Sequence, residues 1–323
     1  MELAEYAALP RAELVSRLEK LKREKNAIVL GHNYQIGAVQ EVSDHLGDSL
    51  KLAQLATETE ADVIVLCGVR FMAESAKILN PNRTVLIPAE AAGCPMAAMV
   101  SADALQEFKS RHPGVPVVCY VNTTAEVKAV SDVCCTSANA VDIVAALPES
   151  EIIFVPDRNL GAYVASKTGK TIIPWEGYCY VHDTFLVEDV VLAKAEHPGV
   201  PIVVHPESPS EVIAEADFVA STGGMMRLAS EHDRLIVGTE IGLIERMNRE
   251  YPEKDFYPLS AFAVCRTMKM IDLPRVVWSL ENGKHEVVVP EDVRARAERA
   301  LSRMLELSRS ASPGAGPSEG GGA

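Results

Sequence analysis

Three cysteines recur at nearly equal intervals along this sequence. Cys94 and Cys179 lie 85 residues apart, and Cys179 and Cys265 lie 86 residues apart. Thiolates ligate zinc and iron–sulfur clusters, but no pair among these three has the Cys-x-x-Cys spacing that is typical of zinc sites. The spacing alone leaves two interpretations open, which are metal ligation and burial as small apolar side chains.

The other four cysteines are interpreted as structural. Cys67 and Cys119 lie on apolar runs that predict buried strands, and Cys134 and Cys135 are adjacent within a single repeat. A buried thiol packs as a small hydrophobic group. We therefore expect these four side chains to belong to the core.

Polar residues recur with a similar period. Three apolar runs end in pairs of polar residues two positions apart, which are His32/Tyr34, Tyr120/Asn122 and His205/Glu207. A hydroxyl residue follows the first member of each pair by 17 residues, and these are Ser49, Ser137 and Thr222. A single hydroxyl near a helix start is most often only a cap, but the shared spacing favours a common site.

The predicted elements repeat as well. The pentapeptide His-Pro-Gly-Val-Pro occurs at residues 112–116 and 197–201, and each copy precedes a β-branched run that predicts a buried strand. The first strands are predicted at 27–34, 117–122 and 202–207, and the next strands at 62–68, 151–156 and 234–238. Closing strands are predicted at 84–87, 171–174 and 255–259, and helices at 50–60, 138–147 and 223–230. We interpret the chain as three copies of one βαβαβαβ unit.

Alternating strands and helices imply an α/β fold whose parallel sheets are covered on both faces. We predict three α/β/α domains related by a pseudo-threefold axis, each with a small parallel sheet, at residues 1–97, 98–182 and 183–274. A strand at 275–280 and a charged helix after Pro290 form a segment, 275–309, that is expected to pack back on the first domain. Residues 310–323 are rich in Gly, Pro, Ser and Ala and are expected to be disordered.

The repeat has a consequence for chemistry, because ligands bind at the carboxyl ends of strands in open parallel sheets. Three domains around one axis would direct the polar pairs and three helix N-termini at one cavity, which suits an anionic ligand. The three cysteines would converge there too, and a cubane cluster on them would keep a fourth iron open as a Lewis acid. The formal charge of −14 argues against nucleic acid and anionic membranes as partners, and we expect a cytoplasmic protein.

Many ordered motifs between about residues 20 and 275 resemble the quinolinate synthase (quinolinate synthetase A) family. They are GHNYQ at 31–35, GDS at 47–49, FMAE at 71–74, ILNP at 78–81, GCPMA at 93–97, YVNTT at 120–124, CTSANA at 135–140, PDRNLG at 156–161, HPE at 205–207, STG at 221–223 and GTE at 238–240.

The resemblance implies an enzyme of de novo NAD biosynthesis, a transferase that condenses iminoaspartate with dihydroxyacetone phosphate to quinolinate and releases phosphate and water. It implies a 4Fe–4S cluster on Cys94, Cys179 and Cys265. Because there is no net redox change, the open iron would act as a Lewis acid. An aspartate oxidase or dehydrogenase is the expected supplier of iminoaspartate, through a transient contact.

The resemblance also implies roles for individual residues. Proton transfer would fall to Tyr34, His182 and Glu207. The substrate contacts would be His32, Ser49, Tyr120, Val121, Asn122, Ser137, His205, Pro206, Glu207, Ser221 and Thr222.

Two positions depart from the family pattern. Tyr180 stands where a proline is expected beside the ligand Cys179. Residues 261–264 lack the additional cysteines that some relatives carry before the third ligand, so no disulfide switch is predicted.

Two other function classes stay open. An iron–sulfur hydro-lyase acting on another small hydroxy-dicarboxylate would use the same open iron and hydroxyl residues. A non-catalytic iron–sulfur sensor or a zinc-stapled binding protein would use the cysteines, but it leaves the recurring His, Tyr, Asn and Glu residues unexplained.

Overall fold

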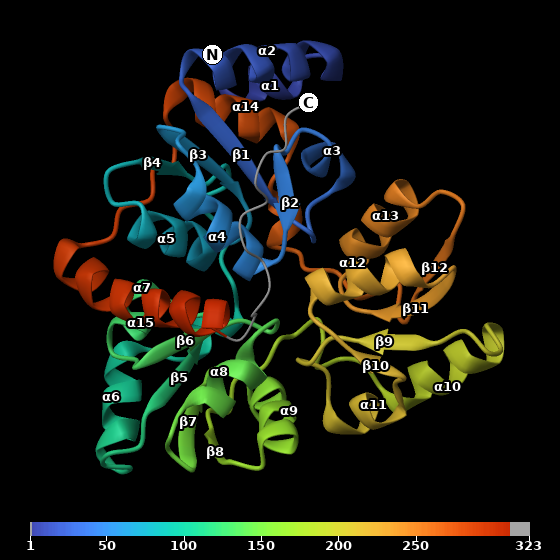
Figure 1. Ribbon diagram of the computed structural model, residues 1–323. Helices are drawn as coiled ribbons and strands as arrows, with labels where there is room; N and C mark the ends of the chain where they lie inside the picture. The colour runs from blue at the N-terminus through green and yellow to red at the C-terminus, as the bar shows by residue number, and fades with distance from the viewer. Residues whose placement is uncertain (1, 311–323) are drawn as a thin grey trace, which may run out of the picture.

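Three four-stranded parallel sheets form the framework of the computed structural model, which describes residues 2–310 (Figure 1). Each sheet has the same strand order, β2-β1-β3-β4, β6-β5-β7-β8 and β10-β9-β11-β12. All neighbouring strands run parallel. The predicted α/β class, with three small parallel sheets of one repeated topology, is confirmed.

The strands are short. The first sheet contains β1 Ala27–His32, β2 His45–Gly47, β3 Val63–Cys67 and β4 Thr84–Leu86. The second contains β5 Val117–Tyr120, β6 Val133–Cys135, β7 Glu151–Val155 and β8 Thr171–Pro174. The third contains β9 Ile202–Val204, β10 Phe218–Val219, β11 Arg234–Gly238 and β12 Asp255–Pro258.

We call each sheet with its helices a lobe, and Figure 1 shows the three lobes arranged around a common centre. The first lobe has α1 Leu3–Ala7, α2 Arg11–Glu24, α3 Gly37–Gln40, α4 Ser49–Glu58 and α5 Arg70–Leu79. The second has α6 Ala102–Ser110, α7 Ala125–Ala129, α8 Ala140–Ala146 and α9 Arg158–Thr168. The third has α10 Val187–Glu196, α11 Ser210–Glu215, α12 Thr222–Glu231 and α13 Ile241–Glu250.

The second strand of each sheet has only two or three residues, too few to show a hydrophobic period. A repeated aspartate marks the turn before each of these strands. In all three lobes its Oδ2 accepts the backbone N–H of a first-strand residue at 2.8 Å, and the pairs are Asp44 with Val29, Asp132 with Val117, and Asp217 with Ile202. The bond fixes the start of the strand whose other end carries the polar pair.

Both faces of the third sheet are covered, as expected for parallel strands. Ile202, Val204 and Ile236 pack into one buried cluster, and the alternate residues Val203 and Val237 pack into another. A single larger cluster joins the cores of the first and second lobes with the C-terminal helices.

The strand predicted at 275–280 is wrong, because this segment lies in helix α14, Leu273–Asn282. Its buried residues Leu273, Val276, Val277 and Leu280 have helical spacing, and Asp272 caps the first turn by accepting the N–H of Arg275. The β-branched pair at 276–277 has strand propensity, but the N-cap and the helical spacing of the buried residues outweigh it.

The two C-terminal helices pack on different lobes. Helix α14 contacts α1, α2 and β3 of the first lobe. The charged helix predicted after Pro290 is confirmed as α15, Glu291–Ser310, but it lies across α7, α8 and β6 of the second lobe as well as α5 of the first (Figure 1).

The disordered tail predicted at 310–323 falls, apart from Ser310, outside the described residues, and Ser310 is the last residue of α15. Within residues 2–310, no helix has both the length and the apolar character needed to cross a bilayer.

Candidate active site between the three lobes

A pocket at the carboxyl ends of the strands collects the recurring residues from all three lobes. Its lining includes His32, Tyr34, Ser49, Cys94, Tyr120, Asn122, Ser137, Cys179, His182, His205, Glu207, Thr222 and Cys265. Strand ends supply the polar pairs because the parallel strands of each sheet finish at the same edge. The lobes thus bring together residues that are far apart in the sequence.

Each lobe contributes one cysteine to this wall, from the loop after its last strand. Cys94 follows β4, Cys179 follows β8 and Cys265 follows β12, and all three are half-buried free thiols. Burial raises the pKa of Cys94 to about 12, and the nearby Cys265 adds to the rise. Burial, Glu207 and Cys94 raise the pKa of Cys179 well above its usual value. The three thiols therefore line the same pocket.

The remaining cysteines, Cys67, Cys119, Cys134 and Cys135, are fully buried free thiols in the core of the first two lobes, as predicted.

A chain of hydrogen bonds crosses the pocket between two tyrosines. Tyr34 Oη lies 2.7 Å from Thr239 Oγ1, which lies 2.8 Å from His182 Nε2. His182 Nδ1 lies 2.6 Å from Glu207 Oε2, and the hydroxyl of Tyr120 donates to Glu207 Oε1. The chain joins residues of all three lobes and connects each of the predicted proton-transfer residues to the next.

Charge in this chain is concentrated on one carboxylate. Burial opposes ionisation of Glu207, but His205, His182 and the hydrogen bonds from His182 and Tyr120 outweigh it and lower its pKa. Burial and the charge of Glu207 raise the pKa of Tyr34 and of Tyr120 well above 10. At neutral pH the site therefore holds an ionised carboxylate hydrogen-bonded to His182 and Tyr120, and two protonated phenols.

The hydroxyl residues lie near helix N-termini, and Thr222 Oγ1 also accepts a hydrogen bond from Asn33 Nδ2 at 2.9 Å. Asp48 and Ser221 cap α4 and α12, so Ser49 and Thr222 are the first helical residues and are not needed as caps. Ser137 precedes α8, and its Oγ lies 3.2 Å from His205 Nε2. The hydroxyls thus stand beside helix N-termini, where anions are stabilised.

Three of the residues expected to contact substrate do not line the pocket. Val121, Pro206 and Ser221 lie next to lining residues in the sequence but are absent from the described wall. The carbonyl oxygen of Val121 accepts from the buried Lys128, and Ser221 caps its helix.

Thr239 is the site residue that the sequence reasoning missed. It is fully buried at the carboxyl end of β11, where its hydroxyl links Tyr34 and His182. The only signal was its place in the GTE motif directly after a predicted strand.

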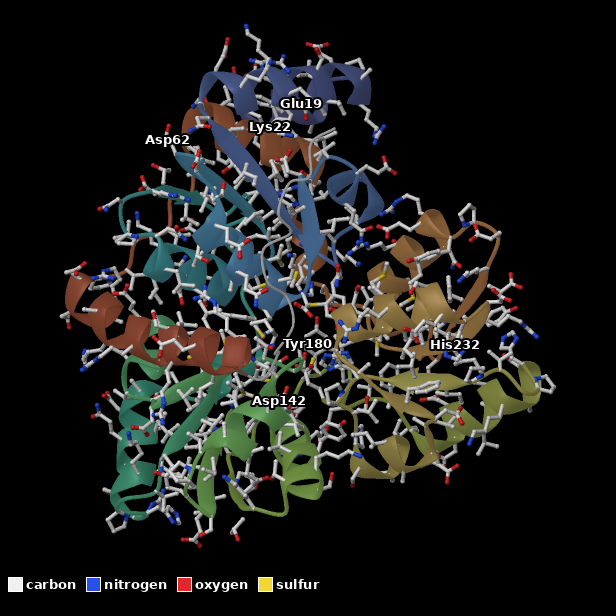
Figure 2. The ribbon with its side chains drawn as sticks, viewed as in Figure 1. Glu19, Lys22, Asp62, Asp142, Tyr180 and His232 are labelled. Atoms are coloured by element: carbon white, nitrogen blue, oxygen red, sulfur yellow. The ribbon has the colours of Figure 1, made fainter. Side chains whose placement is uncertain are left out.

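Tyr180, labelled near the centre of Figure 2, gives the departure from the family pattern a structural role. Its hydroxyl accepts the N–H of Arg266 at 2.8 Å and donates to the carbonyl oxygen of Val264 at 3.5 Å. These two residues flank Cys265, so Tyr180 ties the loop of one cysteine to the loop of another.

Another group of residues with metal-ligand atom types overlaps the site. Ligand atoms of Cys179, His182 and Glu207 lie within 4.8 Å of one another. Both nitrogens of His182 already have partners, Glu207 on one side and Thr239 on the other. A mononuclear metal would have to break these bonds.

Replacing Thr239 with valine is expected to lower kcat at least about 10-fold, because the short link between Tyr34 and His182 is lost and only their direct contact at 3.4 Å remains. The unpaired partners should also lower the free energy of unfolding by about 1–3 kcal/mol. Steady-state kinetics and urea unfolding measure the two effects. Thr239→Ser keeps the hydroxyl and should retain most of the activity, and equal losses in both variants would contradict the role.

Acid is expected to destabilise the folded protein through two histidines. Burial lowers the pKa of His32 and of His205 from 6.5 to about 3. Below pH 6.5 the unfolded chain binds protons there while the folded protein does not, so stability falls as the pH falls, by about 1.4 kcal/mol per pH unit for each histidine. Urea unfolding of cluster-free protein between about pH 6 and pH 4 measures the slope. His205→Gln should reduce this slope by the contribution of one proton. An unchanged slope would show that the pH dependence does not come from His205.

Comparison with known proteins assigns the chain to a family. The profile of the quinolinate synthetase A protein family matches residues 16–306. The chain is 54% identical over 298 residues to a quinolinate synthase of Dehalococcoides mccartyi strain CBDB1, covering 91% of this chain and 99% of the relative. It is 53% identical over 298 residues to a quinolinate synthase of Pyrococcus furiosus, covering 92% and 98%. The chain belongs to the quinolinate synthetase A family and is an enzyme of that kind.

Proposed function

We propose that the protein makes quinolinate, the ring precursor of NAD, by condensing iminoaspartate with dihydroxyacetone phosphate and releasing phosphate and water. The observation that carries the proposal is a single pocket that receives a thiol, hydroxyl groups and a polar strand-end pair from each of three lobes. The relatives named quinolinate synthase match nearly the whole chain, which supports the same activity here.

Cys94, Cys179 and Cys265 would hold a 4Fe–4S cluster. Bound there, the cluster would supply an iron without a protein ligand, which serves as a Lewis acid toward substrate oxygen. The donor set fits this group, because three free thiols, one from each lobe, line one wall. The raised pKa of Cys94 keeps its proton in place until a metal displaces it.

The rest of the wall suits a substrate rich in carboxylate and phosphate oxygens. Ser49 and Thr222 open α4 and α12, whose free N–H groups favour anions. His32 and His205 are neutral at pH 7 and can donate hydrogen bonds without adding charge. Asn122 Oδ1 is buried at the pocket, and no described residue provides its hydrogen-bond partner. A bound donor would satisfy it.

Proton transfer would run along the chain between the tyrosines. Bond formation between the substrates requires a proton to leave carbon, and loss of water requires one to reach oxygen. The Glu207 carboxylate is placed to accept a proton directly or through His182 Nδ1. Tyr34 Oη, whose pKa is raised, is placed to donate one, and Thr239 connects it back to His182.

The test is an anaerobic assay of purified, iron-replete protein with dihydroxyacetone phosphate and iminoaspartate made in place by an aspartate oxidase. Quinolinate in the product mixture, identified by mass, is the expected result. A protein that holds about four irons yet forms no quinolinate would refute the proposal. Dehydration of small hydroxy-dicarboxylates by such a protein would instead indicate a hydro-lyase.

A further inference from the structure

Glu240 is a fully buried carboxylate that has no part in the chemistry proposed above. It follows Thr239 at the end of β11 and is the N-cap of α13. Its side chain does not line the described pocket. A charged group is seldom buried to this degree unless it is paired and hydrogen-bonded.

The partners of Glu240 connect a cluster loop to the pocket. Its Oε1 accepts the backbone N–H of Cys265 at 3.1 Å, and its Oε2 accepts the N–H of Gly242 at 2.8 Å. Lys269 Nζ lies 2.9 Å from Oε1 and also donates to the backbone oxygen of Tyr34 at 2.7 Å. One buried carboxylate thus holds the main chain of Cys265 and, through Lys269, the main chain of Tyr34.

The packing around this group is tight, which fixes its geometry. A Cβ at Gly242 would lie 2.6 Å from Lys269 Nζ and 2.9 Å from both Glu240 Oε2 and the Tyr34 oxygen. Only glycine leaves room for the carboxylate, the ammonium group and the carbonyl oxygen to meet. Any side chain at 242 would separate them.

We propose that Glu240 is a positioning residue, which holds Cys265 in place as a ligand and couples it through Lys269 to Tyr34. The inference rests on the proposed cluster, whose third ligand is Cys265. Groups that hydrogen-bond around a metal site orient its ligands, and losing one typically weakens metal retention about 10- to 100-fold.

The repeat offers a comparison within the same molecule. Asp157 occupies the equivalent place in the second lobe, where it is buried and caps α9 by accepting the N–H of Leu160 at 2.7 Å, but burial raises its pKa and its Oδ2 has no hydrogen-bond partner among the described residues. In the first lobe the N-cap of α5 is Val69, whose side chain cannot accept a hydrogen bond. The side chain of Glu240 thus accepts the N–H of a pocket cysteine, whereas Asp157 caps its own helix and Val69 offers no acceptor.

The test measures how fast a chelator removes iron from anaerobically reconstituted protein. Glu240→Ala is expected to lose iron about 10- to 100-fold faster than the parent, and Gly242→Ala should also be faster. Glu240→Gln keeps the size of the side chain but not its charge, and should fall between the parent and Glu240→Ala. The electron paramagnetic resonance signal of the reduced cluster should change in the Glu240 variants, because the surroundings of one ligand change.

Asp272→Ala is the matched control, because it removes an N-cap from α14, a helix outside the described pocket lining. It should lower the free energy of unfolding by about 1 kcal/mol and leave the rate of iron loss unchanged. Equal rates of iron loss in Asp272→Ala and the Glu240 variants would overturn the positioning role. If Glu240→Ala does not fold, the test relies on Glu240→Gln. A rate of iron loss and a resonance signal equal to those of the parent would then overturn the positioning role.

The parent protein separates this inference from the proposed function. If the parent protein takes up no iron, both the proposed function and the positioning role of Glu240 are refuted. If the parent instead holds about four irons and forms quinolinate while the Glu240 variants retain iron equally well, only the role of Glu240 is refuted.

Discussion

Replacing Cys94, Cys179 or Cys265 with alanine is expected to abolish iron binding and activity together. Each of the three lies on a different lobe but lines the same pocket, so under the proposed function each would supply a ligand that no neighbouring thiol can replace. Iron should fall from about four per chain to near zero. Losing a Lewis acid worth several kcal/mol should reduce turnover by roughly 10³-fold or more. Iron analysis, visible absorption and the quinolinate assay measure these losses.

The control for this prediction is a cysteine that the structure places in the core. Cys67 ends β3 and is fully buried away from the described pocket lining. Cys67→Ala should cost about 1 kcal/mol of stability and keep its iron and its activity. If Cys67→Ala loses iron, or if a variant of one of the three pocket cysteines keeps it, the ligand assignment is wrong.

The arrangement of the site could be predicted largely because it repeats. A single cysteine or histidine is ambiguous, but Cys94, Cys179 and Cys265 share a spacing with strands whose ends carry His, Tyr and Glu. Parallel strands must present their carboxyl ends at one edge, so a repeat of one topology predicts one shared cavity. The pocket lining agrees with that geometry.

What escaped prediction depends on contacts between distant segments. Thr239 and Glu240 are adjacent, yet Thr239 bonds to Tyr34 and His182 while Glu240 bonds to the loop of Cys265. No hydrophobic period or spacing distinguishes two such neighbours. Their roles follow only from tertiary contacts between segments far apart in the sequence.

Local sequence patterns also gave a wrong prediction where the same residues could form either a strand or a helix. The run Val276-Val277-Trp278 has strand propensity, but Asp272 and Pro274 before it are helix-start signals, and packing against α2 and β3 favours the helix. Ser221, which the family resemblance places at the substrate, is the N-cap of α12 and is absent from the described pocket lining, so its contact with substrate stays a prediction.

Replacing Glu207 with glutamine is expected to lower kcat by about 10²- to 10⁴-fold while the iron content stays at the parental value. Glutamine preserves the size of the side chain and can still accept a hydrogen bond from Tyr120 or His182. It cannot accept a proton. It also removes the negative charge from the series of hydrogen bonds that joins Tyr34 to Tyr120. Single-turnover and steady-state kinetics at pH 7 measure the loss, and KM should change much less than kcat.

The iron content of this variant decides between two roles for Glu207. If Glu207 were a ligand in a mononuclear site with Cys179 and His182, whose ligand atoms lie within 4.8 Å of one another, Glu207→Gln would lose metal along with activity. If Glu207 moves protons, the metal stays and only turnover falls. Glu211→Gln, on the exposed surface of α11, controls for loss of a negative charge and should match the parent in both respects. Activity of Glu207→Gln within about threefold of the parent would refute both roles, since a carboxylate with either function cannot be replaced by an amide at so small a cost.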